Sequence, residues 1–578
     1  MNIVINGVDF KISDEDKNLS LLEFCYKNQI EILALCYLLC GVNSGKCGLC
    51  RVEITQNDGT SNDRISKIKP ACLVSLEDGL NVVTDSQKLK DMQTKAVVKL
   101  LEKHDFSCAQ CYRKTNCEFL NIVQKTRAKT ANPYKADPAK IYSGPTLTID
   151  SNKCVLCARC VSTCAAKTRT KSVEISQTDF GRAVRPAGDS GFEASNCLLC
   201  GQCVASCPVA ALQETSHIAK VARALENNSL HTVAAIAPAV RTALGELFRL
   251  PRGTDVTAKI YTALRTLGFK SVFDLNFAAD LTIMEEAAEL VERIRNKGPF
   301  PLFTSCCPAW IRQVENYFPE LKPNVSTVKS PQQIYGASAK SYFSEKNKIA
   351  KENIFTVSIV PCTAKKFEAD RAGMVNDNVR NIDAVLTTRE LAELLGRQKI
   401  RLPKLEDGSA DKLMGEYSGA GGLFGVTGGV MEAAIRTAKD TLTGLNEPVI
   451  DYCAIRGFKG IKESEVKIGQ TVLKIAVVDG AANLFDFVES GQIKNYHFIE
   501  VMACEAGCIG GGGQPHISAK DQLLGDWKKQ RASVLYSQDE KSIIRKCHEN
   551  PEIKLIYSSF FEKPLSAKAH KYLHYEYK

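Results

Sequence analysis

The sequence predicts a multidomain protein of mixed α+β and α/β class, and three observations support this fold class. The chain has 578 residues, 44% hydrophobic and 24% charged, which gives room for three to five globular domains. Seventeen of the 24 cysteines lie before residue 208, in short clusters. Beyond about Leu225, apolar strands such as TVAAIAPAV alternate with helical segments, which is typical of an α/β domain with buried, largely parallel strands.

The first predicted domain covers residues 1–86 and opens with a β-hairpin. Asn6-Gly7 lies between alternating apolar residues, which is the strongest short signal for a hairpin, and a helix is expected over 21–28. Four later cysteines resemble the ligand set of a plant-type [2Fe–2S] ferredoxin with its β-grasp fold: Cys36, Cys47, Cys50 and Cys72. Cys40 is a spare thiol in the same loop and the alternative first ligand. The polar stretch 56–69 is expected to be a surface loop.

The second predicted domain, residues 87–135, carries a histidine beside three cysteines. A helical pattern over 88–103 leads into this segment. The four residues are His104, Cys108, Cys111 and Cys117. This set resembles the His-ligated [4Fe–4S] site in the large iron–sulfur subunit of respiratory complex I. A structural histidine or a zinc site is the alternative, and the neighbouring ferredoxin-like segments favour the cluster.

The third predicted domain, residues 136–220, contains an internal repeat of four cysteines. The second set follows the first by 43 positions, and its last member precedes Pro208. This is the arrangement of bacterial two-cluster ferredoxins, in which the fourth cysteine of each run binds the other cluster. One [4Fe–4S] cube is therefore assigned Cys154, Cys157, Cys160 and Cys207. The other cube is assigned Cys164, Cys197, Cys200 and Cys203.

The fourth predicted domain, residues 221–578, carries three cysteine motifs: TSCCPAW, VPCTAKKFEAD and MACEAGCIGGGGQP. They resemble the signature sequences of the [FeFe]-hydrogenases, and the N-terminal modules resemble those of the long clostridial members with four accessory clusters. The resemblance covers nearly the whole chain. It implies an α/β hydrogenase domain that encloses an H-cluster, a [4Fe–4S] cube linked to a diiron subcluster with CO, cyanide and a dithiolate bridge. The implied cube ligands are Cys307, Cys362, Cys504 and Cys508.

The resemblance also implies a proton path that ends at Cys306, the thiol beside the first cube ligand. Glu286, Glu289 and Arg293 share one face of a predicted helix, because they are three and four residues apart. Carried over by motif, a relay of groups suited to proton transfer runs inward through Arg293, Glu289, Ser326, Glu286 and Cys306. The alternative is a solvated Glu289–Arg293 pair on an exposed helix.

Further residues are implied to line the H-cluster pocket. Lys365, three residues after Cys362, matches the position that supplies a hydrogen bond to a cyanide ligand, and a surface lysine is the alternative. The other implied lining residues are Pro238, Pro331, Gln332, Phe424 and Met502. Three positions depart from the family pattern: Ala239 replaces a serine, Val360 a methionine, and Glu505-Ala506 the usual Pro-Gly. They are expected to affect the rate and direction of catalysis, because hydrogen bonds and charge tune a cluster's potential.

These assignments use 19 cysteines as ligands and one as a proton donor, so four remain. Cys25 lies on an apolar helical face, where a core role is expected. No chemistry is assigned to Cys40, Cys453 or Cys547. The formal charge is +10, but each cluster with four thiolates adds about −2, so the loaded protein is expected to be close to neutral. Nucleic-acid binding is therefore not expected, and basic patches would instead dock an acidic ferredoxin.

The protein is expected to be cytoplasmic. A secreted protein would use 24 cysteines mainly for disulfides, whereas a cytoplasmic one uses them for metal. The start, MNIVINGVDFKI, has no basic region followed by an apolar core and no twin-arginine pair, so a signal peptide is not expected. The apolar stretch 232–240 has nine residues including a proline, which is too short to cross a membrane.

The function that the resemblance implies is that of a monomeric hydrogenase, which interconverts two protons and two electrons with dihydrogen. Reduced ferredoxin or flavodoxin would be the carrier, one [2Fe–2S] and three accessory [4Fe–4S] clusters the electron wire, and maturation proteins would install the diiron unit. One alternative is a hydrogen sensor, which intact Cys306, Glu286 and Glu289 disfavour. The other is a non-hydrogenase electron-transfer subunit like that of complex I, which would lack the three motifs.

Overall fold

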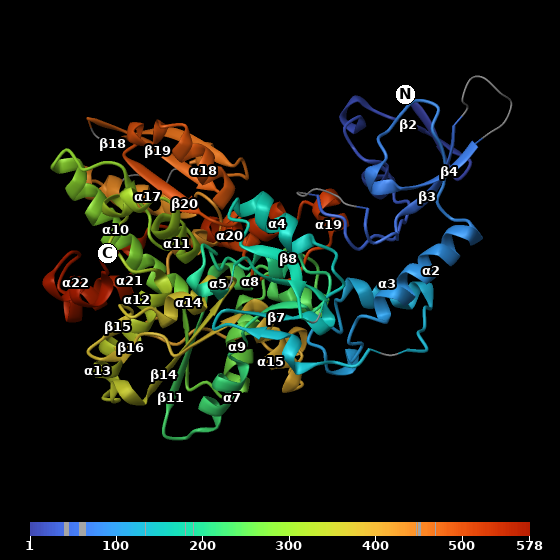
Figure 1. The fold of residues 1–578 in the computed structure, drawn as a ribbon. Coiled ribbons are helices and arrows are strands. Elements are labelled where there is room, and N and C mark those ends of the chain that lie inside the picture. The colour runs from blue at the N-terminus through green and yellow to red at the C-terminus, as the bar shows by residue number, and fades with distance from the viewer. Residues whose placement is uncertain are drawn as a thin grey trace.

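The structure is a computed structural model of the 578-residue chain. It describes every residue except 40–44, 57–64, 133, 180, 189, 447, 449–451, 469 and 578. Figure 1 shows an N-terminal lobe beside a larger body, with the helices α2 (Gln87–Leu101) and α3 (Glu118–Thr126) next to both. Within the described residues, no helix combines the length and the apolar character that crossing a bilayer requires.

The N-terminal lobe is a five-stranded sheet that packs on α1 (Leu21–Lys27). The predicted hairpin is confirmed: β1 and β2 pair antiparallel, with Ile5 opposite Val8 across Asn6-Gly7. Both turn residues have positive φ, as the tightest hairpin turns require. β1 also pairs in parallel with β5, which gives the mixed sheet of a β-grasp fold. In the order β2-β1-β5-β3-β4, the strands are Val8–Lys11, Asn2–Ile5, Asn81–Val83, Arg51–Gln56 and Ile65–Pro70.

The expectation of a surface loop over 56–69 is wrong in part. Residues 65–70 form β4, which pairs antiparallel with β3 along its whole length. β4 is the outer strand of the sheet, and Lys67 and Lys69 are exposed on it. Lysines on an outer strand oppose pairing with other chains, so a polar sequence is compatible with a strand at this place. Residues 57–64, and Cys40 with them, lie outside the described residues.

The cysteine-rich region consists of two helices and a ferredoxin-like unit. The helix predicted over 88–103 is α2 (Gln87–Leu101), and α3 (Glu118–Thr126) follows the His104 segment. In the ferredoxin-like unit, α4 (Arg159–Thr168) packs on α6 (Gln202–Ser206), and each helix begins within one cysteine run. The strands of this unit are β6 (Ile141–Ser143), β7 (Leu147–Asp150), β8 (Val173–Thr178), β9 (Gly181–Pro186) and β10 (Leu212–Glu214).

The C-terminal body is built on two four-stranded sheets. The first, in the order β12-β11-β14-β17, is fully parallel, as predicted for an α/β domain. Its strands are Ser271–Asp274, His231–Ile236, Ile354–Val360 and Ala384–Thr387. The second has the order β13-β20-β19-β18, with only β18 antiparallel to its neighbour. Its strands are Leu302–Phe303, Phe498–Met502, Thr471–Asp479 and Ile461–Ile468. The sequence did not reveal this second sheet as a separate layer.

The long helix α10 (Leu275–Arg295) contributes to the cores of both sheets and positions much of the site. Its first half packs into the core around the first sheet, through Phe277 and Leu281. Its second half packs into the core around the second sheet, through Ile283 and Leu290. A helix that contacts two cores is buried around most of its circumference, so the charged residues along it need internal partners.

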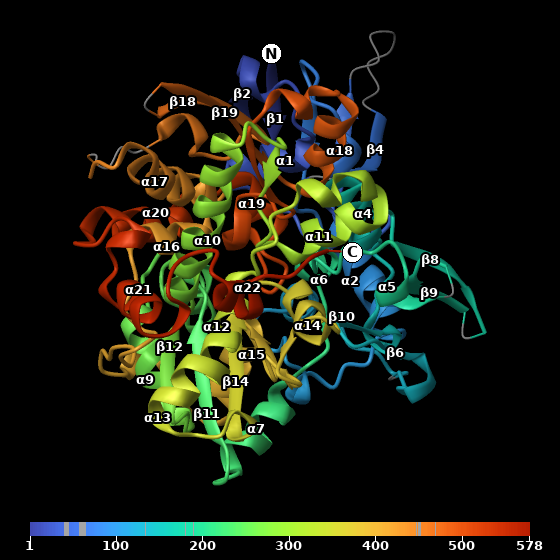
Figure 2. The same cartoon turned by 90° about the vertical axis from the view of Figure 1, so that its left-hand side faces the viewer.

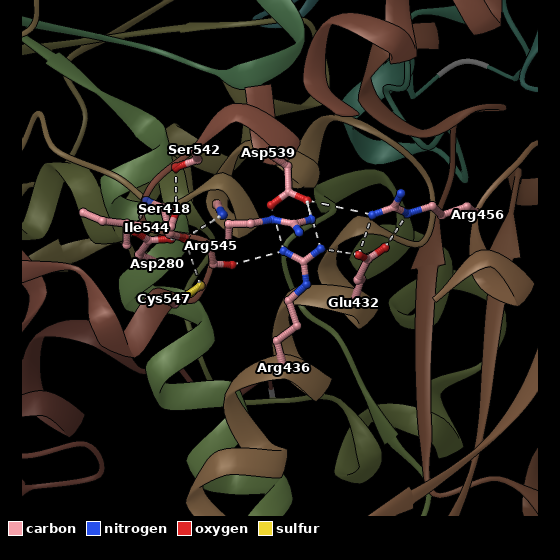
Figure 3. Close-up of polar contacts among 11 residues, drawn as sticks. Asp280, Ser418, Glu432, Arg436, Arg456, Asp539, Ser542, Ile544, Arg545 and Cys547 are labelled. Atoms are coloured by element: carbon pink, nitrogen blue, oxygen red, sulfur yellow. Dashed lines mark hydrogen bonds and ion pairs between the residues drawn. The ribbon is translucent and has the colours of Figure 1, made fainter. Parts of the chain in front are cut away.

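The C-terminal segment is anchored to the body by buried ion pairs (Figure 3). The helices involved are α12 (Pro331–Ser338), α17 (Gly429–Thr443), α20 (Trp527–Lys541), α21 (Pro551–Ile556) and α22 (Ala567–Leu573). α21 packs on α10 and α22 on α12 (Figure 2). Asp539 of α20 accepts hydrogen bonds of 2.8 and 2.9 Å from Arg436 of α17, and one of 2.6 Å from Arg545. Glu432 contacts Arg436 and pairs with Arg456 at 2.7 Å.

Candidate active site

An apolar cavity of about 80 Å³ lies where strands of both sheets end. Cys306 and Cys307 follow β13, Cys362 follows β14, and the last two motif cysteines follow β20. Loops at the carboxyl ends of strands are where α/β folds bind ligands. The cavity is lined by all five motif cysteines, Cys306, Cys307, Cys362, Cys504 and Cys508, and by Pro238, Pro331, Gln332, Lys365, Phe424 and Met502. The structure therefore brings together residues from three distant motifs.

The thiols around this cavity disfavour one another's ionisation. Burial raises the pKa of Cys362 to about 12, and the charge of Cys307 adds to the effect. Burial also raises the pKa of Cys504 and of Cys508, again with contributions from neighbouring thiolates. Several buried thiolates at one site need a compensating positive charge. A cationic iron–sulfur core supplies that charge, so the donor set fits a cluster. Among the described residues, no group of three or more His, Cys, Asp or Glu side chains is arranged to hold a single metal ion.

Lys365 lies at the edge of the cavity and is held by a buried carboxylate that the sequence did not reveal. Its ammonium donates to both oxygens of Glu368, at 2.9 and 3.0 Å, and to the carbonyl of Cys306 at 3.1 Å. Burial alone would lower the pKa of Lys365, but the charge of Glu368 outweighs it and raises the pKa. Gln332 and Ser330 also donate to Glu368, each at 2.9 Å. Lys365 is therefore not a surface lysine, and it lines the cavity.

Glu286 is a fully buried carboxylate on α10, beside the thiol of Cys306. Burial raises the pKa of Glu286 to about 8, although hydrogen bonds from Ser305 act in the opposite direction. The backbone N–H and the hydroxyl of Ser305 donate to Oε1, at 3.1 and 3.3 Å. Its Oε2 has no hydrogen-bond partner among the described residues. Burial raises the pKa of Cys306, and the charge of Glu286 is the second cause. Both groups therefore hold protons near neutral pH.

The outer part of the predicted relay is a continuous chain of hydrogen bonds. Arg293 donates to Glu289 at 2.9 Å, and Ser326 donates to the other oxygen of Glu289 at 2.7 Å. The Glu289–Arg293 pair of the alternative interpretation exists, but its side chains are only 15% and 12% exposed. Among the described contacts, no direct hydrogen bond joins Ser326 to Glu286 or Glu286 to Cys306.

The three departures from the family pattern occupy two different environments. Ala239 and Val360 line the cavity. Glu505 instead pairs with Lys167 of α4 at 3.3 Å and with Lys528 of α20 at 3.5 Å. Burial would raise the pKa of Glu505, but the two lysines outweigh it and lower the pKa, so the carboxylate is ionised. The sequence showed the charge but not its two partners.

The two cysteine runs of the ferredoxin-like unit form two groups in the predicted combination. A small cavity is lined by four thiols, Cys154, Cys157, Cys160 and Cys207. The second group lies beside it: burial raises the pKa of Cys203, with contributions from Cys197, Cys200 and Cys164 in that order. The last cysteine of the second run thus lies with the first run, which is the exchange expected of a two-cluster ferredoxin.

The cysteines of the N-terminal lobe lie in two close pairs. The side chains of Cys36 and Cys47 are hydrogen-bonded, and Cys50 and Cys72 have their sulfurs 3.5 Å apart. The hydrogen bond from Cys36 lowers the pKa of Cys47 to about 6, and backbone N–H groups such as that of Leu49 add to the effect. Two pairs of thiols suit a binuclear cluster, in which each iron takes two.

His104 is buried and oriented like a metal ligand. Its Nδ1 lies 2.8 Å from the carbonyl oxygen of Lys153, so this nitrogen carries the proton and Nε2 keeps its lone pair. Burial lowers the pKa of His104, which keeps the ring neutral. Burial also raises the pKa of Cys108, and the charges of Cys117 and Cys111 are the next causes. The three cysteines therefore lie close enough to influence one another, within the segment that also carries His104.

The remaining described cysteines lie away from these sites. Cys25 is in the core of the N-terminal lobe, as expected. Cys453 is exposed. Cys547 is buried with its sulfur 3.6 Å from the hydroxyl of Ser418, which donates to Asp280 at 2.6 Å (Figure 3). Burial raises the pKa of Asp280 to about 6.

Sequence models of four protein families match this chain. They are “Iron only hydrogenase large subunit, C-terminal domain” over residues 230–512, “Iron hydrogenase small subunit” over 525–578, “Iron hydrogenase 1-like, iron-sulfur centre-binding domain” over 90–128 and “2Fe-2S iron-sulfur cluster binding domain” over 3–77. The first of these ranges contains the cavity.

Individual relatives agree with the family matches. Iron hydrogenase 1 of Clostridium pasteurianum is 49% identical over 582 residues, which cover 100% of this chain and 99% of the relative. The NADP-reducing hydrogenase subunit HndD of Solidesulfovibrio fructosivorans is 37% identical over the same shares of both chains. A solved structure of the apo [FeFe]-hydrogenase HydA1 from Chlamydomonas reinhardtii is 38% identical, with a TM-score of 0.56, and covers 63% of this chain and 99% of its own.

The chain is similar to iron hydrogenase 1 along its whole length, and a hydrogenase family model matches the domain that contains the cavity. Together these two findings identify the family. The described region holds the cysteine-rich segments that iron–sulfur clusters need, and the N-terminal lobe matches a [2Fe–2S] domain. The chain therefore belongs to the [FeFe]-hydrogenase family, the iron-only enzymes that interconvert protons and dihydrogen.

Proposed function

We propose that this hydrogenase holds its H-cluster in the apolar cavity at the strand ends. The ligands of the cube would be Cys307, Cys362, Cys504 and Cys508. The supporting observation is that one buried cavity is lined by these four thiols and a fifth, Cys306, from three distant motifs. When bound, the H-cluster supplies the iron centre at which two protons and two electrons are exchanged with dihydrogen. The residues around it bind and orient it, exclude water and move protons.

The residues of the pocket divide into a cationic donor and an apolar wall. Lys365, fixed by Glu368, would turn one of its three N–H donors from the carbonyl of Cys306 to a cyanide ligand. Pro238, Phe424 and Met502 would exclude water from the uncharged face of the group, and Pro331 and Gln332 would complete the wall. Burial of Lys365 with its counter-ion keeps the ammonium in one place, which a solvated lysine would not do.

We infer that protons reach Cys306 along α10. Arg293 orients Glu289, and Ser326 carries the proton inward from Glu289. One water molecule would bridge Ser326 to Glu286, because no direct hydrogen bond spans that step among the described contacts. Glu286 would then pass the proton to Cys306 through its unpartnered Oε2. The raised pKa of Glu286, about 8, suits a group that must both accept and release a proton near neutral pH.

We place four domains at residues 1–86, 87–135, 136–220 and 221–578, and the accessory clusters of the first three would form an electron wire that leads to the fourth. The [2Fe–2S] cluster would use Cys36, Cys47, Cys50 and Cys72. The His-ligated cube would use His104, Cys108, Cys111 and Cys117. The paired cubes would use Cys154, Cys157, Cys160 and Cys207, and Cys164, Cys197, Cys200 and Cys203. The close pairs and the shared cavity described above support this division.

This wire predicts a high iron content. Fully matured protein is expected to contain about 20 irons by ligand counting, two in the binuclear cluster, twelve in the accessory cubes and six in the H-cluster. Iron analysis and Mössbauer spectra of matured protein check the number and type of clusters. A His104→Ala variant should lose one cube and keep the other centres. A total that corresponds to only one or two clusters would contradict the wire.

The carrier and the cellular setting belong to the same proposal. Electrons pass between dihydrogen and an acceptor, for which we propose a ferredoxin or flavodoxin. The N-terminal lobe stands out from the body, so a small carrier protein could approach it. We further propose a cytoplasmic monomer whose diiron unit is installed by maturation proteins. An infrared spectrum of matured protein is the decisive test of the H-cluster. Bands from iron-bound CO and cyanide are expected, and their absence would contradict the proposal.

The charge of Glu505 is expected to have a salt-dependent effect on the midpoint potential of the active-site cube. Glu505→Gln removes the charge that compensates Lys167 and Lys528 beside Cys504, so it should raise the midpoint potential of the active-site cube. The side chain is 40% exposed, so the effect should be modest and should shrink at high salt. Infrared spectroelectrochemistry at low and high ionic strength measures it. Glu489→Gln, an exposed carboxylate that pairs with Arg169, is the control. Identical potentials at low salt would contradict the prediction.

A further inference from the structure

Gln202 connects the ferredoxin-like unit to the cavity of the hydrogenase domain. It begins α6, between Cys200 and Cys203, and is only 6% exposed. Its side-chain Nε2 lies 3.4 Å from the sulfur of Cys504 and 2.9 Å from the carbonyl oxygen of Gly510. An amide nitrogen can donate two hydrogen bonds, so one donor fixes the side chain and the other is aimed at the sulfur.

The backbone of the same residue serves the neighbouring group of thiols. The N–H of Gln202 donates toward Cys200, which opposes the rise in the pKa of that thiol caused by burial. Charge on Cys200 is also the second cause, after burial, of the raised pKa of Cys504. One residue therefore hydrogen-bonds to a sulfur of each group, at the place where the two groups influence each other.

The backbone packing at this junction leaves little freedom for the contact to move. A Cβ on Gly201 would lie 2.5 Å from the hydroxyl oxygen of Thr363, and one on Gly512 would lie 2.1 Å from the carbonyl oxygen of Cys200. The hydroxyl of Thr363 donates to the carbonyl of Leu199 at 2.6 Å. The segments that carry the two groups of thiols thus approach closely because Gly201 and Gly512 have no side chains. This close packing fixes the position of the Gln202 amide next to the sulfur of Cys504.

We propose that Gln202 is a positioning residue that sets the potential of the active-site cube relative to the neighbouring accessory cube. A hydrogen bond from an N–H to a ligand sulfur stabilises the more negative, reduced cluster and so raises its potential. The backbone bond to Cys200 does not depend on the side chain, so a side-chain substitution should affect one cube and spare the other. This inference rests on the proposed ligand roles of Cys504 and Cys200.

Two variants of matured, full-length enzyme test the proposal. Gln202→Leu removes the donors, and Gln202→Glu replaces them by an acceptor of the same shape. Infrared spectroelectrochemistry should show the ratio of reduced to oxidised H-cluster falling on the order of tenfold at fixed potential in Gln202→Leu, equivalent to a shift of about 59 mV to lower potential. Gln202→Glu should shift it further in the same direction. The midpoint potentials of the accessory cubes, followed by electron paramagnetic resonance, should stay unchanged.

Gln313 is the matched control, because it is also a buried glutamine that donates to a backbone carbonyl, that of Ala481 at 2.9 Å. Gln313→Leu should leave the H-cluster potential unchanged. Wild-type H-cluster potential in both Gln202 variants, or an equal shift in the control, would overturn the proposal. Loss of CO and cyanide bands from the wild-type protein itself would instead contradict the proposed function, so the two failures are distinguishable.

Discussion

Cys306→Ser is expected to lower turnover about 10²- to 10⁴-fold, the range typical of a lost acid–base group, while the H-cluster remains assembled. The thiol of Cys306 is 8% exposed and lines the cavity without being needed as a ligand of the cube. Burial raises its pKa, so the thiol carries its proton at neutral pH. A serine hydroxyl is a far weaker acid than a thiol, and it would fail to deliver the proton although it fits the space.

Infrared spectra and hydrogen-evolution assays of the same preparations measure this effect. The CO and cyanide bands should persist in Cys306→Ser, whereas Cys307→Ser should damage the cluster itself. Cys25→Ser is the matched control, because Cys25 is also a buried cysteine but lies in the N-terminal lobe. Near-normal turnover in Cys306→Ser would show that another group donates the last proton.

Glu286→Gln should lower turnover by about 10²-fold or more, because an amide cannot accept and release a proton in the relay. The substitution keeps the shape of the side chain and replaces a group whose Oε2 has no partner among the described residues. Glu285→Gln is the control: Glu285 is the adjacent buried carboxylate, but it contacts Tyr557 and His574 instead of the cavity. Equal losses in both variants would indicate a packing effect, not a relay.

The same variant should be more stable than the wild type at neutral pH. The pKa of Glu286 rises from an ordinary value of 4.5 to about 8 in the folded protein. Between these values only the unfolded chain ionises, so the stability of the wild type falls as pH rises through this window. At pH 7 the cost is about 3 kcal/mol, and Glu286→Gln removes it. Thermal unfolding should show the gap between variant and wild type at pH 7 and its loss near pH 4. A gap independent of pH would contradict this cause.

The sequence predicted the cluster-binding segments because ligand spacing is local. The hairpin at Asn6-Gly7 and the helix that carries Glu286 depend on neighbours within a few residues, so their patterns are visible in the chain. The strand β4 was missed because pairing with β3 compensates for a polar, lysine-rich sequence. The second sheet of the hydrogenase domain was not separable, since its strands come from segments nearly 200 residues apart.

The partners of the site residues were beyond prediction for the same reason. The contact between Lys365 and Glu368 could be suspected, because the two residues are three positions apart. The bonds of Glu368 with Gln332 and Ser330, however, join segments more than 35 residues apart. Gln202 contacts Cys504 across 302 positions. Such contacts are determined by tertiary packing and leave no periodic signal, although a polar residue between two ligand cysteines marks a position worth testing.

The buried ion pairs of the C-terminal segment have a consequence for how the enzyme can be encoded. Removing one member of a buried ion pair typically costs about 3–5 kcal/mol, and Asp539 pairs with Arg436 and Arg456 of the body as well as with Arg545 of its own segment. A cut in the backbone near Gly525 would therefore leave the last part of the chain docked. The peptide bond at this junction is therefore not needed to hold the two parts together. Two separate genes could encode them, and the same ion pairs would join the two products as subunits.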